Sequence, residues 1–424
     1  MNNLFTKFLN FKKKPSHKET LFHNIKSTSN VDSIFKAVSN HNEWSEVRYV
    51  GGCVRKILNN EEYDDIDLAT NLNPEQVKEC LTLNKIEFFE TGIKHGTITA
   101  KINNHNFEIT SLRNDIKTDG RHAEVSFTKD WNEDSIRRDF TINSIYADID
   151  GNIFDPNNGL KDLKNGIVKF IGNTEKRIQE DYLRILRYVR FFLLYSSQNH
   201  NNDIKKIIKQ NISGVANLSK ERLLDELKKI FKSKALFKLG EDDFSYEIIS
   251  LIFPQLVNLK ILKKLEKKNE ELLKNKSFNF LLALLIIDSS DNADYFIYKF
   301  KLSNEIKNKI NFLKTHFKNL KEKEFFSKKN LNKIFYYNDR SSVIDLIDFE
   351  LIKSNKKQIK LMELKSYIEK IEKPVFPVKA KNIMEKFNIK EGRELGQKLK
   401  NLEKIWVNNS FSISEKEIEK TFSN

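Results

Sequence analysis

Two aspartates separated by one residue, Asp65 and Asp67, are the side chains of this chain best suited to hold a metal ion. In an extended strand, residues i and i+2 point to the same face, so the two carboxylates would converge there. Convergent carboxylates bind hard divalent cations. Upstream, Gly51 and Gly52 let backbone N–H groups approach a polyphosphate without a Cβ in the way, and Arg55 supplies a fork of donors for phosphate oxygens. Together these residues are the parts of a site for nucleotidyl transfer.

A third acid, Glu108, follows in a segment with the pattern of a β-hairpin. Residues 97–102 and 107–112 alternate in character, and the polar stretch 103–106 between them is typical of a turn. Taken alone, Glu108 is best explained as an outward polar residue on a half-exposed sheet. If its strand neighbours the strand of Asp65 and Asp67, it becomes the missing ligand of a two-metal centre. We therefore predict that Asp65 and Asp67 bind Mg²⁺ and that Glu108 is catalytic with them.

The segment 136–146 contains paired arginines followed by short polar side chains. Arg138 can meet phosphate charge, and Asp139 and Asn143, spaced i, i+4, would share a helix face where they could bind ribose hydroxyls. A helix N-terminus capped by Asp139 also accounts for the aspartate. It does not account for the two arginines.

The apolar periodicity of residues 177–192 predicts one amphipathic helix. Asp181 and Arg184 stand i, i+3 on it, and a surface ion pair is the ordinary explanation of that spacing. The alternative is more specific. A carboxylate beside a guanidinium offers an acceptor next to a donor, which complements the Watson–Crick edges of cytosine and adenine and opposes those of guanine and uracil. One side-chain pair could thus select C and A without a nucleic-acid template.

In this order the motifs resemble those of class II tRNA nucleotidyltransferases, the CCA-adding enzymes, in the family that also contains bacterial poly(A) polymerase. The resemblance is strongest over residues 47–195 and rests on Gly51-Gly52-x-Val-Arg55, Asp65-x-Asp67, His95-Gly96-Thr97, Glu108, Arg137-Arg138-Asp139 through Asn143, Asp155-Pro156, and Glu180-Asp181-x-x-Arg184-x-x-Arg187. It implies contacts with the incoming nucleotide for Gly52, Arg55, Arg138, Asp181, Arg184, Arg187 and Arg190. With Gly51, Asp139 and Asn143, these are the predicted nucleotide-binding residues. One departure is that Lys56 and Asn59-Asn60 stand where the family usually has Asp and a Leu-Gly turn, so we expect a differently shaped loop before the acids.

The activity that the resemblance implies is template-independent addition of C, C and A to the 3′ end of tRNA, from CTP and ATP, with release of pyrophosphate. A poly(A) polymerase shares most of the motifs, but residues 91–97 resemble the CCA-adding form. An enzyme that adds only A or only CC is a second alternative, because the loop 114–134 and the helical neck control when addition stops. A non-catalytic RNA-binding protein is a third, and the three retained acids argue against it.

Composition agrees with an RNA-handling enzyme. The chain has 74 Lys and Arg against 59 Asp and Glu, a net charge of +15 that would attract a polyanion and make binding salt-dependent. Its two cysteines, Cys53 and Cys80, have no ligand spacing and indicate a reducing compartment. The longest apolar run, residues 278–287, is too short to span a membrane and predicts a buried helix. We expect a cytoplasmic protein, or one of an organellar matrix if the basic N-terminus is a presequence, with no membrane association and no stable protein partner.

The fold class predicted is α+β, because strand and helix patterns alternate up to about residue 170 and only helical patterns follow. The expected parts are a loosely ordered basic leader (1–28, with a linker at 27–30), a nucleotidyltransferase head with a mixed β-sheet and helices (29–170), and an elongated all-α neck (171–235), body (236–372) and RNA-binding tail (373–424). The resemblance implies that the tail grips the tRNA elbow. Lysine-rich faces on the later helices are ordinarily solvated and alternatively bind RNA. Gly392 and Gly396 in the tail favour close helix packing over a phosphate-binding turn.

Overall fold

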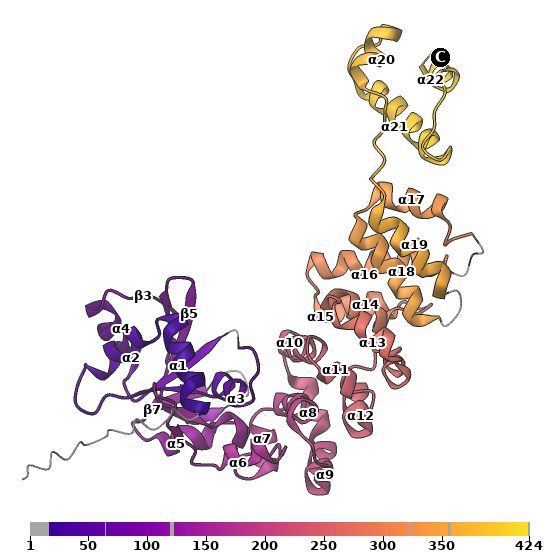
Figure 1. Cartoon of the computed structure of the whole chain (residues 1–424). Helices are drawn as coiled ribbons and strands as arrows, with labels where there is room; N and C mark the ends of the chain where they lie inside the picture. Colours follow the sequence, from indigo (N-terminus) through magenta and orange to yellow (C-terminus); the bar gives the residue numbers. More distant parts are fainter. Residues whose placement is uncertain are drawn as a thin grey trace, which may run out of the picture. The chain divides into compact units, whose positions relative to one another are not determined.

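The computed structural model describes residues 17–63, 65–118, 123–320, 322, 324–354 and 358–422 (Figure 1), so the basic stretch 1–14 lies outside the described residues. The chain forms two compact units, Met1–Ala235 and Leu236–Asn424. Strands occur only in the first unit among the residues described, and the second is built from helices. The predicted α+β class is confirmed.

A mixed sheet of seven strands forms the centre of the first unit, in the order β3-β4-β5-β2-β1-β8-β9. The strands are β1 (Val47–Val50), β2 (Ile66–Thr70), β3 (Glu87–Gly92), β4 (Thr97–Ile102), β5 (His105–Ser111), β8 (Tyr146–Ala147) and β9 (Ile153–Phe154). β2 and β5 run parallel, and the other neighbouring pairs run antiparallel. The hairpin predicted around residues 103–106 is the β4–β5 hairpin, and its turn uses Asn103 at φ 54°.

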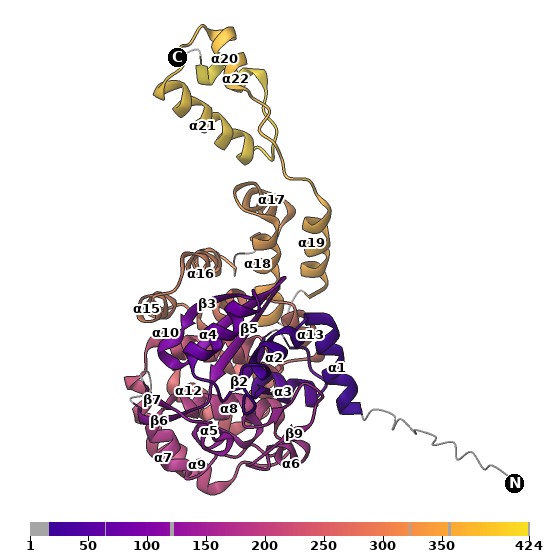
Figure 2. The same cartoon turned by 90° about the vertical axis from the view of Figure 1, so that its left-hand side faces the viewer.

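Helices cover one face of this sheet: α1 (His17–Ser29), α2 (Asp32–Ser39), α3 (Gly52–Leu58) and α4 (Pro74–Leu83), and both views place α2 and α4 beside it (Figure 2). The core between them includes the buried Leu68 of β2 and the buried Phe107 and Ile109 of β5. Because side chains alternate along a strand, Asp67 and Glu108 point to the opposite face. The sheet therefore separates a dry core from a face that carries acids.

The interpretation of residues 27–30 as a linker is wrong, because α1 extends to Ser29 and belongs to the core of the head. Phe22 and Ile25 of α1 are 0% and 1% exposed, and the ring of Phe22 lies 5.4 Å from that of Tyr49. These two apolar residues stand one helical turn apart, and Leu21 beside Phe22 packs against the same core. Their burial holds α1 against the sheet.

The segment 114–134, expected to be a loop, contains regular structure. β6 (Arg113–Thr118) and β7 (Ala123–Phe127) pair as a two-stranded sheet, and α5 (Trp131–Arg137) follows. Further along, α6 (Gly159–Lys164) packs closely on the 3₁₀ helix η2 (Thr141–Asn143). A Cβ at Gly159 would stand 2.0 Å from the carbonyl oxygen of Thr141, so only glycine permits this approach.

The single helix predicted over 177–192 is two helices, α7 (Thr174–Glu180) and α8 (Leu183–Tyr195). Asp181 has an extended backbone, with φ −154° and ψ 103°, and its carboxylate accepts a hydrogen bond from the backbone N–H of Leu183 at 3.1 Å. The extended backbone of Asp181 thus ends α7, and its carboxylate binds the N–H of Leu183, the first residue of α8. The helices α9 (Asn202–Asn211) and α10 (Lys220–Phe231), with the 3₁₀ helix η3 (Ile212–Asn217) between them, complete the first unit, and α10 packs against α8.

The second unit follows α11 (Ala235–Lys238) with α12 (Asp243–Ile252), η4 (Leu259–Lys264), α13 (Lys267–Lys274), α14 (Phe278–Ile286), α15 (Asn292–Phe300), α16 (Asn304–Phe317), α17 (Lys328–Tyr337), α18 (Arg340–Lys353), α19 (Gln358–Lys370), α20 (Ala380–Phe387), α21 (Arg393–Asn408) and α22 (Glu415–Phe422). The burial predicted for 278–287 is confirmed, since most side chains of α14 lie in the interior. None of the described helices is both long and apolar enough to cross a membrane.

The last three helices, α20 to α22, have an apolar cluster of their own, built from Ile383, Leu395, Leu402 and Phe422. Trp406 of α21 is 3% exposed, and its ring lies 5.2 Å from that of Tyr336. The close helix packing expected at Gly392 and Gly396 is wrong. A Cβ at either glycine would meet no atom within 4 Å.

Candidate active site

The pairing of β2 with β5 brings two of the three predicted acids together. Asp67 stands directly opposite Glu108 in the parallel register, and Asp65 precedes β2 by one residue. Burial, the charge of Glu108 and the charge of Asp65 raise the pKa of Asp67 to about 6, although Arg138 and Arg55 act in the opposite direction. Burial and the two neighbouring carboxylates therefore disfavour the ionised form of Asp67.

This arrangement fits a divalent cation in charge and in donor type. A cation beside Asp67 would favour the ionised carboxylate that burial and Glu108 disfavour, and carboxylate oxygens are the ligands that hard cations prefer. Within the described part of the chain, no three His, Cys, Asp or Glu side chains converge closely enough to hold an ion by themselves. Ligands from water and from the phosphates of a substrate would have to complete the coordination.

The two glycines and Arg55 form the side of the site that faces Asp67. Gly51 has φ 70°, which favours glycine, and a Cβ at Gly52 would stand 3.8 Å from Oδ2 of Asp67 and 3.9 Å from Nη2 of Arg55. Arg55 is 5% exposed and donates to Oδ1 of Asn143. Its guanidinium lies 4.7 Å from the ring centre of Phe191, which fixes its direction.

The loop before the acids closes despite its departure from the family pattern. Asn60 takes a left-handed conformation with φ 55°, the conformation that a glycine would supply. The backbone N–H of Glu61 bonds to the carbonyl of Lys56 at 2.9 Å, which closes the end of α3. Asparagine is the residue that tolerates this conformation best after glycine.

Asp139 and Asn143 meet, although they do not lie on one helix. The expectation of one helix face is wrong, because α5 ends at Arg137 and η2 begins at Thr141. Nδ2 of Asn143 nonetheless donates to Oδ1 of Asp139 at 2.8 Å, and Arg187 binds Oδ2 of Asp139 at 2.6 Å. Burial raises the pKa of Asp139, but Arg187 and Asn143 outweigh it and hold that pKa at about 2.

Arg138 is held by Asp134, which sequence reasoning missed. Nη2 of Arg138 lies 3.0 Å from Oδ2 of Asp134, and the hydroxyl of Tyr146 donates to the same oxygen at 2.7 Å. Asp134 is buried. Although burial raises its pKa, Arg138 and Arg137 hold it well below its usual range. The i, i+4 spacing of Asp134 and Arg138 was the available signal.

The predicted surface pair of Asp181 and Arg184 is replaced by two separate ion pairs. Asp181 binds Arg222 of α10 at 2.7 Å, and Arg184 binds Glu180 at 2.6 Å. Arg184 also donates to the carbonyl of Arg177 at 2.7 Å. Both side chains are thus held by other groups at the junction of α7 and α8.

The remaining two predicted arginines, Arg187 and Arg190, share a buried carboxylate. Glu226 of α10 lies 2.7 Å from Nε of Arg190 and 3.6 Å from Nη1 of Arg187. Sequence reasoning missed Glu226 and Arg222 as site residues. Residues 219–231 resemble a further motif of the family named above, although less strongly than residues 47–195 do, and this resemblance was the available signal.

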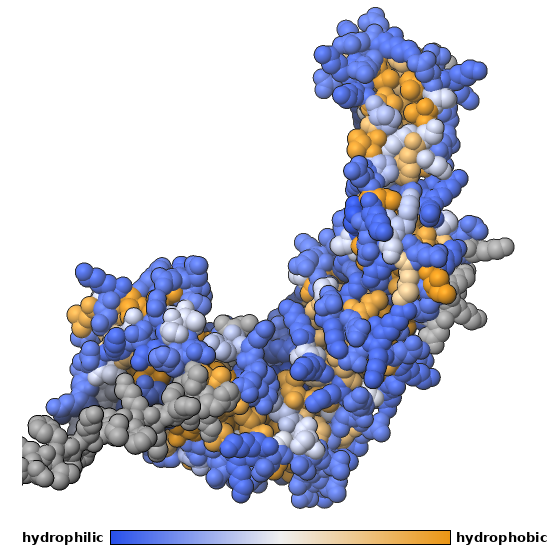
Figure 3. Space-filling view, in the orientation of Figure 1, coloured by the Kyte–Doolittle hydropathy of each residue, from blue (hydrophilic) through white to orange (hydrophobic). Residues whose placement is uncertain are grey.

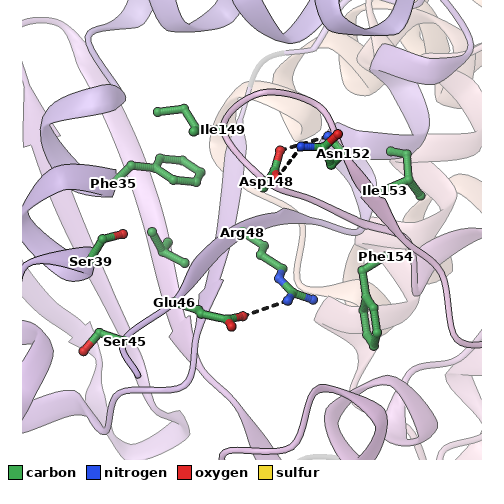
Figure 4. A pocket seen from close by; sticks show the side chains of 11 residues that line it. Phe35, Ser39, Ser45, Glu46, Arg48, Asp148, Ile149, Asn152, Ile153 and Phe154 are labelled. Atoms are coloured by element: carbon green, nitrogen blue, oxygen red, sulfur yellow. Dashed lines mark hydrogen bonds and ion pairs between the residues drawn. The ribbon is translucent and has the colours of Figure 1, made fainter. Parts of the chain in front are cut away.

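A cavity of about 420 Å³ in the head lies apart from these residues (Figure 4). Arg48 crosses it, held by Glu46 at 2.7 Å and placed between the rings of Trp131 and Phe154 at 4.2 and 4.7 Å. None of the predicted site residues is among those that line it in the described part of the chain. We assign it no part in the chemistry.

The fold and the site define a nucleotidyltransferase head followed by helices. Residues 47–169 match the family model described as poly A polymerase head domain, and residues 201–260 match the model described as probable RNA and SrmB-binding site of polymerase A. The mouse protein named CCA tRNA nucleotidyltransferase 1, mitochondrial, is 36% identical over 378 residues, which cover 88% of this chain and 85% of that protein. The human protein of the same name is 35% identical over the same shares. The chain belongs to the family of CCA tRNA nucleotidyltransferases.

Solved structures agree in fold. The Bacillus stearothermophilus CCA-adding enzyme in complex with CTP has a TM-score of 0.67 at 23% identity, covering 93% of this chain and 94% of that one. The Thermotoga maritima CCA-adding enzyme complexed with tRNA has a TM-score of 0.62 at 18% identity, covering 95% of this chain and 97% of that one. These likenesses extend over both units of the chain.

Proposed function

We propose that this enzyme adds C, C and A in turn to the 3′ end of tRNA, from CTP and ATP and without a nucleic-acid template, and releases pyrophosphate. The observation that carries the proposal is the register of β2 and β5, which sets Asp67 opposite Glu108 beside the guanidiniums of Arg55 and Arg138. Membership of the family supports it, as do relatives of the same fold solved with CTP and with tRNA.

In this proposal Asp65 and Asp67 bind Mg²⁺, and Glu108 completes the acidic site. Bound there, Mg²⁺ would lower the pKa of the terminal ribose hydroxyl and neutralise charge on the triphosphate. The backbone of Gly51 and Gly52 lets the phosphates approach.

Around this acidic site we assign two further sets of contacts. Arg55, Arg138, Arg187 and Arg190 supply positive charge around the phosphates, each held in direction by a partner described above. Asp139 and Asn143, whose positions the contacts with Arg187 and Arg55 support, would bind the ribose hydroxyls.

We further propose that Asp181 and Arg184 read the base. Oxygens of Asp181 would accept from the exocyclic amino group of cytosine or adenine, and Arg184 would donate to the neighbouring ring nitrogen. Guanine and uracil present an acceptor to the carboxylate and are repelled.

Asp181→Ala should therefore admit UTP and GTP, because the repulsion disappears while the acids stay in place. CTP and ATP should also be used more slowly, since a hydrogen bond to a charged group contributes about 1.5–3 kcal/mol. Competition among the four triphosphates on tRNA ending in CC measures both effects. An unaltered preference for C and A would place the selectivity elsewhere.

The raised pKa of Asp67 predicts how Mg²⁺ binding depends on pH. In the metal-free protein, the contribution of this group to stability is present below the ordinary aspartate pKa of 3.8 and is lost as the pH rises through about 6. Mg²⁺ needs the carboxylate, so the increase in Tm that Mg²⁺ causes should be larger at about pH 7.5 than at about pH 5. Asp67→Asn should remove this difference. Equal increases at both pH values would contradict the assignment.

The second unit supplies a candidate surface for the RNA. The visible face is largely hydrophilic (Figure 3), and α19 exposes Lys360 and Lys370. Two lysines of the stretch 353–370 have structural roles instead: Lys365 binds Asp348 at 2.9 Å, and Lys353 donates to the carbonyl of Ile287 at 3.0 Å.

Combined Lys360→Gln and Lys370→Gln should raise the KM for tRNA and leave kcat almost unchanged. For every phosphate that the variant no longer binds, the slope of log binding constant against log salt should fall by about 0.7–0.9. Lys36→Gln with Lys101→Gln, on the head, is the matched control for the removal of two charges. A salt slope equal to that of the wild type would mean that Lys360 and Lys370 are solvated and do not bind RNA phosphates.

Three transcripts, ending before CCA, after C and after CC, decide between the proposed function and its alternatives. Sequenced products that all end in CCA support it. A run of A indicates a poly(A) polymerase, and products that stop early indicate an enzyme that adds only part of CCA.

We propose that the neck (171–235) selects the nucleotide and that the tail (373–424) binds RNA. The mouse and human relatives carry mitochondrial names, and we propose a reducing compartment, cytoplasm or organellar matrix, for this chain.

A further inference from the structure

The carboxylate of Asp181 is held at both of its oxygens. Oδ1 accepts from the backbone N–H of Leu183 at 3.1 Å, and Oδ2 accepts from Nη2 of Arg222 at 2.7 Å. The side chains of Asp181 and Arg222 are 18% and 27% exposed, so the pair is largely withdrawn from water. A carboxylate with one anchor can rotate about its last bond. Two anchors on different elements fix its plane.

The helix that carries Arg222 is itself fixed. Glu226 stands one turn further along α10 and binds Arg190 of α8 at 2.7 Å, with only 2% of its side chain exposed. Leu223 and Leu227 on the same helix are buried. Arg222 therefore projects from a helix that the buried Glu226–Arg190 pair holds against α8. Its backbone position is fixed by that packing.

Arg184, the proposed hydrogen-bond donor to the base, is held by contacts that do not involve Arg222. Arg184 binds Glu180 and the carbonyl of Arg177, both within α7. Arg222 contacts Asp181 at the junction before α8. Loss of Arg222 would thus free the carboxylate of Asp181 to rotate and leave Arg184 in place.

We propose that Arg222 is a positioning residue for nucleotide selection. It orients the Asp181 carboxylate so that a remaining lone pair meets the exocyclic amino group of cytosine or adenine and repels the carbonyl oxygen of uracil or guanine. An ionised carboxylate has about four acceptor sites, and the two anchors occupy two of them. This inference rests on the proposed function, in which Asp181 reads the base.

Arg222→Gln in the full-length enzyme tests the inference through selectivity. The ratio of kcat/KM for CTP to that for UTP, on tRNA lacking CCA, should fall by about tenfold or more. Arg222→Lys keeps a cation on Asp181 and should restore most of the ratio. Lys228→Gln is the matched control: it removes a charge from the same helix, at a residue that is 36% exposed and lies 3.5 Å from Asp225. Its ratio should equal that of the wild type.

A double-mutant cycle shows whether Arg222 acts through Asp181. The ratio in Asp181→Ala with Arg222→Gln should equal that in Asp181→Ala alone, because no carboxylate remains to be oriented. The inference is overturned if Arg222→Gln lowers kcat/KM equally for all four triphosphates. It is also overturned if the effects of the two substitutions on the CTP/UTP ratio multiply in the double variant. If Arg222→Gln keeps the ratio and Asp181→Ala loses it, the inference fails and the proposed function stands. If Asp181→Ala also keeps the ratio, the base-reading part of the proposed function fails.

Discussion

Replacement of Asp67 by alanine should abolish nucleotide addition and leave tRNA affinity close to that of the wild type. Asp67 stands opposite Glu108, and under the proposed Mg²⁺ assignment its loss removes a metal ligand and with it stabilisation of the transition state. Asp65→Ala should have the same effect. Single-turnover addition of C to a tRNA transcript measures the chemistry, and filter binding measures the affinity.

Asp150→Ala, which removes an exposed carboxylate from a turn of the head, is the control and should add C normally. Turnover of Asp67→Ala within about tenfold of wild type would correspond to a barrier change of only ~1.4 kcal/mol. Such a small effect would contradict the two-metal assignment.

Glu226→Ala should lower the free energy of unfolding more than any surface change in the neck. The carboxylate is 2% exposed and lies between Arg187 and Arg190, so its removal leaves two largely buried guanidiniums without their shared partner. Breaking a buried ion pair from one side costs about 3–5 kcal/mol. Denaturant titration followed by circular dichroism gives the value.

Asp225→Ala, at the neighbouring position, is the matched control because its side chain is 61% exposed. We expect a change within about 0.5 kcal/mol there. If Glu226→Ala costs no more than Asp225→Ala, the buried pairs do not stabilise the neck.

The features that local sequence rules describe were predictable. The alternation and turn around residues 103–106 gave the β4–β5 hairpin, and strand periodicity placed Glu108 on the face away from the core. The change to helices after the head followed from apolar spacing of 3.6 residues.

The missed features depend on contacts between distant segments. At the break, the carboxylate of Asp181 pairs with Arg222, 41 residues later, and accepts from the N–H of Leu183. Apolar periodicity continues through the break and does not reveal it. α1 was missed because only Leu21, Phe22 and Ile25 mark its buried side. Burial that depends on a partner surface cannot be read from a segment alone.

The tryptophans give this protein built-in optical probes. The chain has three. Trp131 and Trp406 are 8% and 3% exposed, one in each unit, whereas Trp44 is 80% exposed. A Trp44→Phe variant would keep one shielded indole in the catalytic unit and one in the helical unit. Red shifts of their emission would then report the loosening of each unit, and removal of either indole would assign the signal to the other.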